Sequence, residues 1–209
     1  MLYFNQYLTE AEGPGLTMFD IDDTLFQTDN KVYVKKDGKI VAKLTPAEYN
    51  MYKLKQGEDY DYKEFRTAAL FNKQARPIRP MLAKLKAISK NVHSKPGSKL
   101  IMLTARKNMD DKKTFLDTFK KFGIDIDKIY IERAGNIRAR TDIAKKIITN
   151  DYLKKGKFNR VRLYDDHMQN LKSFLELQTK FPDVVFEAYL VKNGRVTTIK
   201  EAVKELVDA

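Results

Sequence analysis

Three aspartates follow one short apolar segment near the start of the chain. Residues 16–21 (LTMFDI) run into DDTLF, so Asp20, Asp22 and Asp23 lie within four positions. Side chains alternate along an extended segment, so the carboxyl groups of Asp20 and Asp22 can face one site. Carboxylates so close together repel each other unless a cation or phosphate-binding groups compensate them. The pattern therefore favours a metal site over the alternative, an acidic helix cap at Asp23 or Thr24.

A second acidic pair follows another apolar segment. Residues 160–165 (RVRLYD) end in Asp165, and Asp166 comes next. Two carboxylate pairs supply the oxygen ligands that Mg²⁺ prefers. The chain has no cysteine and only two histidines, which excludes thiolate and multi-histidine metal sites. The alternative for this pair is a helix N-cap at Asp166 or His167.

Groups that could bind a phosphoryl group follow a third apolar segment, residues 99–104 (KLIMLT). The hydroxyl of Thr104 and the backbone amide of Ala105 could donate hydrogen bonds to phosphate oxygens. Arg106 could assist an anion, although a solvated arginine is the simpler interpretation.

A lysine pair, Lys145 and Lys146, could offset negative charge at such a site. Adjacent helical residues point about 100° apart, so only one of the two is expected to reach it. We favour Lys145, because Thr141 four residues earlier could cap a helix whose first turns face the site.

These residues can meet only if the fold gathers the ends of several strands. Apolar runs alternate with amphipathic stretches, which predicts an α/β fold with an open, mostly parallel, Rossmann-like sheet covered by helices on both faces. Ligands of such sheets bind outside the carboxyl ends of the strands. The predicted strands are 16–21, 99–104, 128–132, 160–165 and 184–191, and the predicted helices are 81–92, 114–122, 141–153 and 168–177.

Residues 28–78 interrupt this alternation and predict a small inserted cap on a core made of residues 1–27 and 79–209. Residues 31–43 indicate a hairpin around Asp37-Gly38, since this pair suits a type I′ turn. Helices are expected from Pro46 to about residue 55 and over residues 62–71. Long insertions of this kind are more often functional than decorative, so the cap is expected to act as a lid.

The motifs resemble those of the haloacid dehalogenase (HAD) superfamily. DIDDTL is similar to the first HAD motif, LIMLTAR to the second and LYDD to the fourth, while the KK pair fits the looser third motif. The insertion stands where the family carries its type 1 cap. The general pattern gives no role to His167 or Asn170.

The resemblance implies a magnesium-dependent phosphatase. Asp20 would be the nucleophile that forms an aspartyl-phosphate, and Asp22 the general acid and base. Thr104 and Lys145 would hold the phosphoryl oxygens. The metal ligands implied are Asp20, the backbone carbonyl of Asp22, Asp165 and Asp166, and the substrate-binding residues are Thr24, Ala105 and Arg106.

The expected substrate is a nucleotide or a phosphorylated nucleic-acid end. The sequence also looks like small phage and bacterial relatives of the polynucleotide 3′-phosphatase domain, and its net charge of +12 with a pI near 9.6 agrees with a polyanionic partner. A cap that closes would instead select a free nucleotide. The alternative from another class is a nucleic-acid-binding accessory protein without catalysis. The chain shows no apolar run long enough for a membrane span and no signal-peptide pattern at its start, so a cytoplasmic location, or the host cytoplasm if phage-encoded, is expected.

Overall fold

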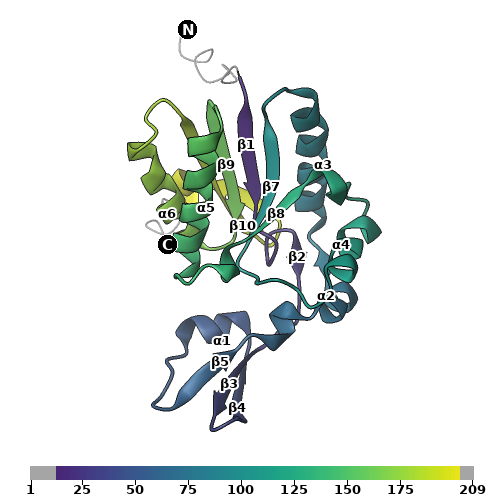
Figure 1. Cartoon of the computed structure of the whole chain (residues 1–209), viewed down its shortest axis with the longest axis vertical. Coiled ribbons are helices and arrows are strands. Elements are labelled where there is room, and N and C mark those ends of the chain that lie inside the picture. The colour runs from purple at the N-terminus through teal and green to yellow at the C-terminus, as the bar shows by residue number, and fades with distance from the viewer. Residues whose placement is uncertain (1–12, 203–209) are drawn as a thin grey trace.

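A mostly parallel sheet forms the centre of the molecule. The computed structural model describes residues 13–202, and in this part of the chain six strands pair in the order β11-β10-β9-β1-β7-β8 (Figure 1). Only β11 runs antiparallel to its neighbour. The strands are β1 (Gly15–Phe19), β7 (Lys99–Thr104), β8 (Tyr130–Arg133), β9 (Arg160–Asp165), β10 (Val185–Lys192) and β11 (Arg195–Thr198).

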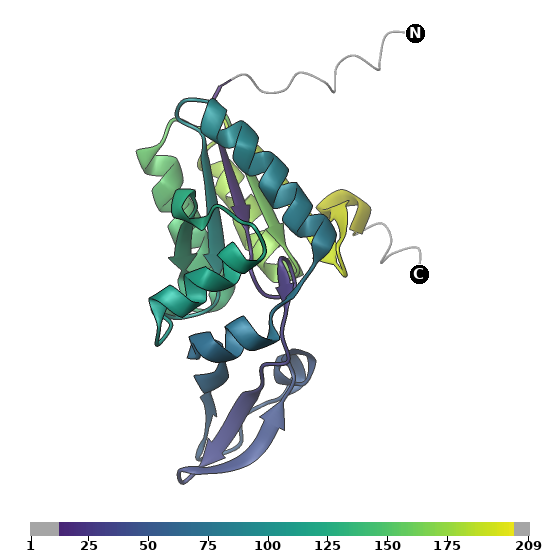
Figure 2. The same cartoon turned by 90° about the vertical axis from the view of Figure 1, so that its right-hand side faces the viewer.

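Helices cover both faces of this sheet, as Figures 1 and 2 show. Apolar side chains of α2 (Ala68–Gln74), α3 (Arg79–Ser94) and α4 (Lys112–Lys121) pack on one face. Those of α5 (Thr141–Lys155) and α6 (Met168–Leu175) pack on the other. Short 3₁₀ turns complete the core: η3 (Ile126–Lys128), η4 (Ala134–Asn136) and η5 (Glu176–Thr179). The predicted fold class is confirmed; β11 is an addition that the sequence analysis missed.

The strand order explains why distant motifs can share a site. β1 lies between β7 and β9 and is parallel to both, so the carboxyl ends of all three strands meet at one edge. The pairing with β9 continues past the end of β1, where the amide of Asp20 donates to the carbonyl of Tyr164 at 2.9 Å. The chain passes from β1 to β7 on one side and later returns to β9 on the other, which makes this edge a topological switch point.

The inserted segment forms a small sheet beyond the carboxyl ends of the core strands (Figure 1). Its strands β3 (Val32–Lys36), β4 (Lys39–Leu44) and β5 (Glu58–Asp61) pair in the order β4-β3-β5. The predicted hairpin is confirmed, with φ of 50° at Asp37 and 77° at Gly38, the positive values that a type I′ turn requires. Strand β5 was not predicted.

Both helices predicted in the insertion differ from the structure. Helix α1 (Pro46–Met51) begins with a capping box between Thr45 and Glu48 but ends four residues earlier than expected. The predicted helix 62–71 is instead a 3₁₀ turn, η2 (Lys63–Arg66), followed by α2. The backbone of Thr67 is extended, with φ of −89° and ψ of 104°, and this breaks the helix in two.

Part of the predicted cap packs with the core. The cap has its own small apolar cluster around Val32, Val34 and Leu44. The buried side chains of residues 68–78, in contrast, join the core cluster under α3 and α4: Ala68, Phe71, Ala75 and Ile78. Strands β2 (Phe26–Gln27) and β6 (Arg76–Pro77) pair where the chain leaves and re-enters the core. The compact body of the cap is therefore smaller than the segment 28–78.

None of the helices within residues 13–202 combines the length and apolar character needed to cross a lipid bilayer. The expectation about a signal peptide concerns residues 1–15, of which residues 1–12 lie outside the described part of the chain.

Candidate active site

Three carboxylates meet at the switch point. Asp20 directly follows β1, and Asp165 and Asp166 stand at the end of β9. One carboxylate oxygen from each lies within 4.8 Å of the others. Asp20 and Asp165 are buried and Asp166 is half-buried. The structure thus brings together residues that are about 145 positions apart in sequence.

A buried lysine lies between these acids. Nζ of Lys145 donates to Oδ1 of Asp20 and to Oδ2 of Asp165, each at 2.7 Å. Burial by itself lowers the pKa of Lys145, but the carboxylates of Asp165 and Asp20 outweigh burial and raise this pKa above its usual range, so the ammonium stays charged. Lys146 points elsewhere and pairs with Glu176 on the surface.

Lys145 reaches the site, but Thr141 is not the helix cap that the sequence predicted. Thr141 does not cap the helix; it is the exposed first residue of α5, and Arg140 occupies the N-cap position without a side-chain cap. The start of α5 is instead fixed by Asp142, which is buried and accepts hydrogen bonds from Ser173 on α6 at 2.7 Å and from Arg140 at 2.7 Å. Lys145 reaches the acids from the next turn of this anchored helix.

Negative charge in the cluster exceeds what one lysine compensates. Burial raises the pKa of Asp20 to about 7. The Lys145 ammonium opposes this rise, and the carboxylates of Asp165 and Asp22 add to it. Burial together with the charges of Asp20 and Asp165 raises the pKa of Asp166 to about 9. A divalent cation would relieve this repulsion, and three oxygens this close suit a hard ion. The residues present therefore fit Mg²⁺.

Two donors that sequence reasoning missed hold Asp165 in place. Its Oδ1 accepts hydrogen bonds from the backbone amide of His167 and from Nδ2 of Asn170, both at 2.9 Å. Asn170 is buried on the first turn of α6, whereas the side chain of His167 is exposed. The signal for Asn170 is its spacing: a polar side chain at an inward helical position, four and five residues after an acidic pair. His167 caps α6 by position, but its side chain makes no capping bond.

Arg106 was expected to be solvated or to bind substrate, yet it is 2% exposed. Its Nε donates to Oδ2 of Asp22 at 2.9 Å and its Nη2 donates to Oδ1 of Asp22 at 2.7 Å. Its Nη1 donates to the backbone carbonyl of Phe65 in the cap at 3.1 Å. The interpretation as a solvated arginine is wrong, because this guanidinium is buried and paired.

The remaining substrate-binding and catalytic candidates, Thr104, Ala105 and Thr24, are close in sequence to Arg106 or Asp22. Thr104 is fully buried at the end of β7, and its Oγ1 accepts the backbone amide of Arg106 at 3.1 Å. Ala105 is exposed between them. Thr24 is fully buried, and its hydroxyl has no hydrogen-bond partner among the described residues.

The alternative interpretation of the first acidic group, a helix N-cap at Asp23 or Thr24, is wrong. In the described structure no helix begins after Asp23 or Thr24; the chain forms a tight turn in which the amides of Leu25 and Phe26 donate to the carbonyl of Ile21. Asp23 sits in this turn at φ of 54°, a left-handed conformation that costs free energy in a residue other than glycine.

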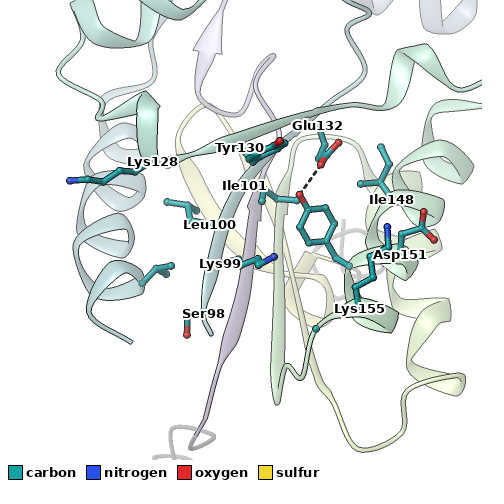
Figure 3. Close-up of a pocket in the computed structure, with 13 residues that line it drawn as sticks. Ser98, Lys99, Leu100, Ile101, Lys128, Tyr130, Glu132, Ile148, Asp151 and Lys155 are labelled. Atoms are coloured by element: carbon teal, nitrogen blue, oxygen red, sulfur yellow. Dashed lines mark hydrogen bonds between the residues drawn. The ribbon is translucent and has the colours of Figure 1, made fainter. Parts of the chain in front are cut away.

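A separate pocket lies at the opposite end of the sheet and contains none of these residues. It has a volume of about 650 Å³ between α5 and the amino ends of β7 and β8. Tyr130 and Tyr152 line it together with Lys99 and Glu132, and the hydroxyl of Tyr152 donates to Glu132 at 2.7 Å (Figure 3). The acidic cluster is therefore distinct from this hollow.

No family model matches the chain, and no curated protein matches it in sequence. Solved structures do match. The HAD domain of the effector Lem4 from Legionella pneumophila has a TM-score of 0.50 at 14% identity, over 95% of this chain and 96% of that chain. The L. pneumophila effector Ceg4, solved with an N-terminal yeast Hog1p sequence, has a TM-score of 0.50 at 16% identity, over 94% and 96% of the two chains. At such identities the likeness shows the fold, which is HAD-like, and the acidic cluster is compatible with a hydrolase of that fold.

Proposed function

We propose that this protein is a magnesium-dependent phosphomonoester hydrolase that acts through an aspartyl-phosphate on Asp20. The single observation that carries the proposal is the meeting of Asp20, Asp165 and Asp166 around Lys145 at the carboxyl edge of a HAD-like sheet. Two buried carboxylates and a half-buried third are costly for stability, so a catalytic metal site gives a reason for the cluster that folding alone does not.

The metal would be held by carboxylate oxygens of Asp20, Asp165 and Asp166, with the backbone carbonyl of Asp22 as a further ligand. When bound, Mg²⁺ neutralises charge on the phosphoryl group and on the attacking carboxylate. Asn170 supports this arrangement, since its hydrogen bond to Asp165 fixes the orientation of one ligand.

The proposed reaction has two steps, attack of Asp20 on phosphorus and hydrolysis of the aspartyl-phosphate, and side chains of this chain act in both. Lys145 donates to Oδ1 of Asp20, so the other carboxylate oxygen, Oδ2, attacks phosphorus. The bond from phosphorus to the leaving oxygen breaks, and Asp22 gives that oxygen a proton. Water then attacks the phosphoryl group, Asp22 takes the proton from the water, and phosphate leaves while the carboxylate of Asp20 is restored. Lys145 and the amide of Ala105 bind the phosphoryl oxygens.

The substrate proposed is a nucleotide or a phosphorylated nucleic-acid end. Its support is the charge: the chain carries 40 basic and 28 acidic residues. A polyanion would be attracted to such a surface, and a strand end could enter beside the cap. The side chain of Asp22 is 25% exposed, so solvent and a leaving group can reach it.

The test is a panel of phosphomonoesters assayed with Mg²⁺ and with chelator. The panel contains p-nitrophenyl phosphate, nucleoside monophosphates, and oligonucleotides with 3′- or 5′-phosphate. We expect Mg²⁺-dependent phosphate release, an acid-stable label on Asp20 in rapid-quench samples, and no turnover by Asp20→Asn. The matched control is Asp117→Asn on the outer face of α4, which should keep full activity.

Wild-type turnover by Asp20→Asn would remove Asp20 from the nucleophile role. Retention of oligonucleotides without any phosphate release would favour the accessory-protein alternative. Selective release from 3′-phosphorylated ends would support the resemblance to polynucleotide 3′-phosphatases.

A further inference from the structure

One face of the central sheet is only partly covered. On this face α3 packs over β7, where Leu100 and Met102 are buried. Strands β9 and β10 are interior strands of the same sheet, yet Val185 of β10 is 47% exposed on this face. In Figure 2, α3 crosses the face and the yellow β10–β11 end of the sheet extends beyond the helix. Mostly parallel sheets are usually covered on both faces, so this part of the sheet is available to a partner.

A stack of three aromatic rings leads into the uncovered part. The ring centroids of Phe19 and Tyr164 lie 4.5 Å apart, those of Tyr164 and Tyr189 lie 4.7 Å apart, and the planes differ by 9° and 10°. Phe19 is fully buried, whereas Tyr189 at the outer end is half-buried. The β11 residue paired with Tyr189 is the small Thr198, and no fourth ring among residues 13–202 stacks on Tyr189. A flat ring could therefore extend the stack on the outer side of Tyr189.

Positive side chains surround the stack. Arg160 and Arg162 alternate along β9 with Tyr164, so all three lie on this face, and both arginines are half-buried. Nζ of Lys84 on α3 lies 5.9 Å from the ring centroid of Tyr164. The acidic residue that β9 and β10 place on this face is Glu187, and it pairs with Arg162. Lys84 and Arg160 therefore leave the face with an excess of positive charge.

We propose that this Tyr189 surface, made of Tyr189, Arg160, Arg162 and Lys84, binds single-stranded nucleic acid. Unpaired bases expose flat faces that can stack on a tyrosine ring, and the phosphates between them are attracted to lysine and arginine. A duplex hides these base faces, and a free nucleotide has too few phosphates to engage several cations. The surface thus fits a strand better than either.

The consequence for the substrate rests on the proposed function. Tyr164 directly precedes Asp165, so the surface lies close to the acidic edge of the sheet. The β10–β11 turn stands between them, since a Cβ added to Gly194 would lie 3.1 Å from Ile78 and 3.4 Å from Pro80 at the start of α3. A single nucleotide in the active site cannot also reach past this turn. The substrate of the hydrolase is then a strand end whose neighbouring nucleotides bind at Tyr189.

The first test needs no activity. Binding of a fluorescent single-stranded octanucleotide without terminal phosphate is measured by anisotropy in chelator. Tyr189→Leu should weaken binding about 5-fold or more, because it removes one base–aromatic stack. Tyr189→Phe keeps the ring and should bind like the wild type. The matched control is Tyr130→Leu, since Tyr130 is 72% exposed on β8 at the other side of the sheet and its loss should leave the affinity unchanged.

The second test concerns the charges. For single strands, the slope of log K against log salt concentration is about −0.7 per phosphate neutralised. Arg160→Gln should therefore make the slope shallower by about 0.7. Lys154→Gln, at an exposed position of α5 over the opposite face, should keep the wild-type slope. If Tyr189→Leu does not fold, the slope of Arg160→Gln decides the question.

The third test connects the surface to catalysis. KM and kcat are measured for end-phosphorylated oligonucleotides of one to eight nucleotides. In the wild type KM should fall with length, and in Tyr189→Leu this dependence should largely disappear. The kinetics with p-nitrophenyl phosphate should be the same in both proteins.

The outcomes separate the two proposals. Equal affinity of Tyr189→Leu and wild type, an equal loss in Tyr130→Leu, or duplex binding as tight as single-strand binding would refute the Tyr189 surface. A KM that does not change with length would refute the strand-end substrate and favour a free nucleotide. A wild-type protein that releases no phosphate from any ester would refute the proposed function, and the anisotropy experiment would still decide whether the surface binds a strand.

Discussion

Replacing Lys145 by methionine is the most direct perturbation of the acidic cluster. The lysine is 3% exposed and makes two ion pairs of 2.7 Å with carboxylates that are themselves buried. Its loss leaves Asp20 and Asp165 without a compensating cation. Breaking a buried pair by removing one partner costs about 3–5 kcal/mol. For a protein of this size, each kcal/mol lowers Tm by about 2–4 °C, so a fall of roughly 6–20 °C is expected.

The assay is urea or thermal unfolding of Lys145→Met in chelator at pH 8.5 and pH 6, and again with Mg²⁺. The cost should be smaller at pH 6, where the carboxyl groups neutralise themselves by binding protons. It should also be smaller with Mg²⁺, which supplies positive charge at the same oxygens.

The adjacent lysine provides the control. Lys146 pairs with Glu176, whose side chain is 57% exposed, so Lys146→Met should cost no more than about 1 kcal/mol. Equal stability of the two variants at pH 8.5 in chelator would show that Lys145 does not compensate buried charge, and the reasoning about the site would be wrong.

Three further outcomes are expected. Without metal, the free energy of unfolding should fall as pH rises from about 4 to 9. The raised pKa values mean that the folded protein keeps a proton on Asp20 up to about pH 7 and on Asp166 up to about pH 9, whereas the unfolded chain has already released both. Mg²⁺ should flatten this dependence, and a rising curve would contradict the raised pKa values. Asn170→Ala should weaken Mg²⁺ binding about 10-fold or more in calorimetric titration, since Asp165 loses an orienting donor, and unchanged affinity would exclude that role. Gly135→Ala should lower Tm, because its methyl group would come within 2.2 Å of the carbonyl oxygen of Ala105 and within 2.8 Å of the carbonyl carbon of Arg106; an unchanged Tm would mean that this loop yields easily.

The fold class, and the gathering of acids at one edge of the sheet, could be predicted from the amino-acid sequence. Apolar runs that end in polar residues predicted the strands, and the alternation with amphipathic helices predicted a covered, mostly parallel sheet. Parallel strands end at a common edge, so the acids after two of these runs could be expected at one place. The Asp37-Gly38 turn was predictable because its positive φ angles depend on local residue preferences alone.

Helix limits in the cap were less predictable. Residues 62–71 carry a helical pattern, yet the chain changes direction at Thr67 so that Phe65 can face Arg106 while Phe71 enters the core. That break serves contacts with residues about 40 positions away. Local propensity does not contain such information.

The partners of the charged side chains could be identified only from the packing of the folded chain. Lys145 and Lys146 are chemically identical neighbours. Because adjacent helical residues point in different directions, Lys145 pairs with the buried acids and Lys146 pairs with Glu176. The sequence around Arg106 suggests a surface arginine, but in the structure its guanidinium donates hydrogen bonds to Asp22 and to the carbonyl of Phe65. Composition records how many charges a chain has, but the partner of each charge is fixed by packing between segments far apart in sequence, where burial makes an unpaired charge too costly to keep.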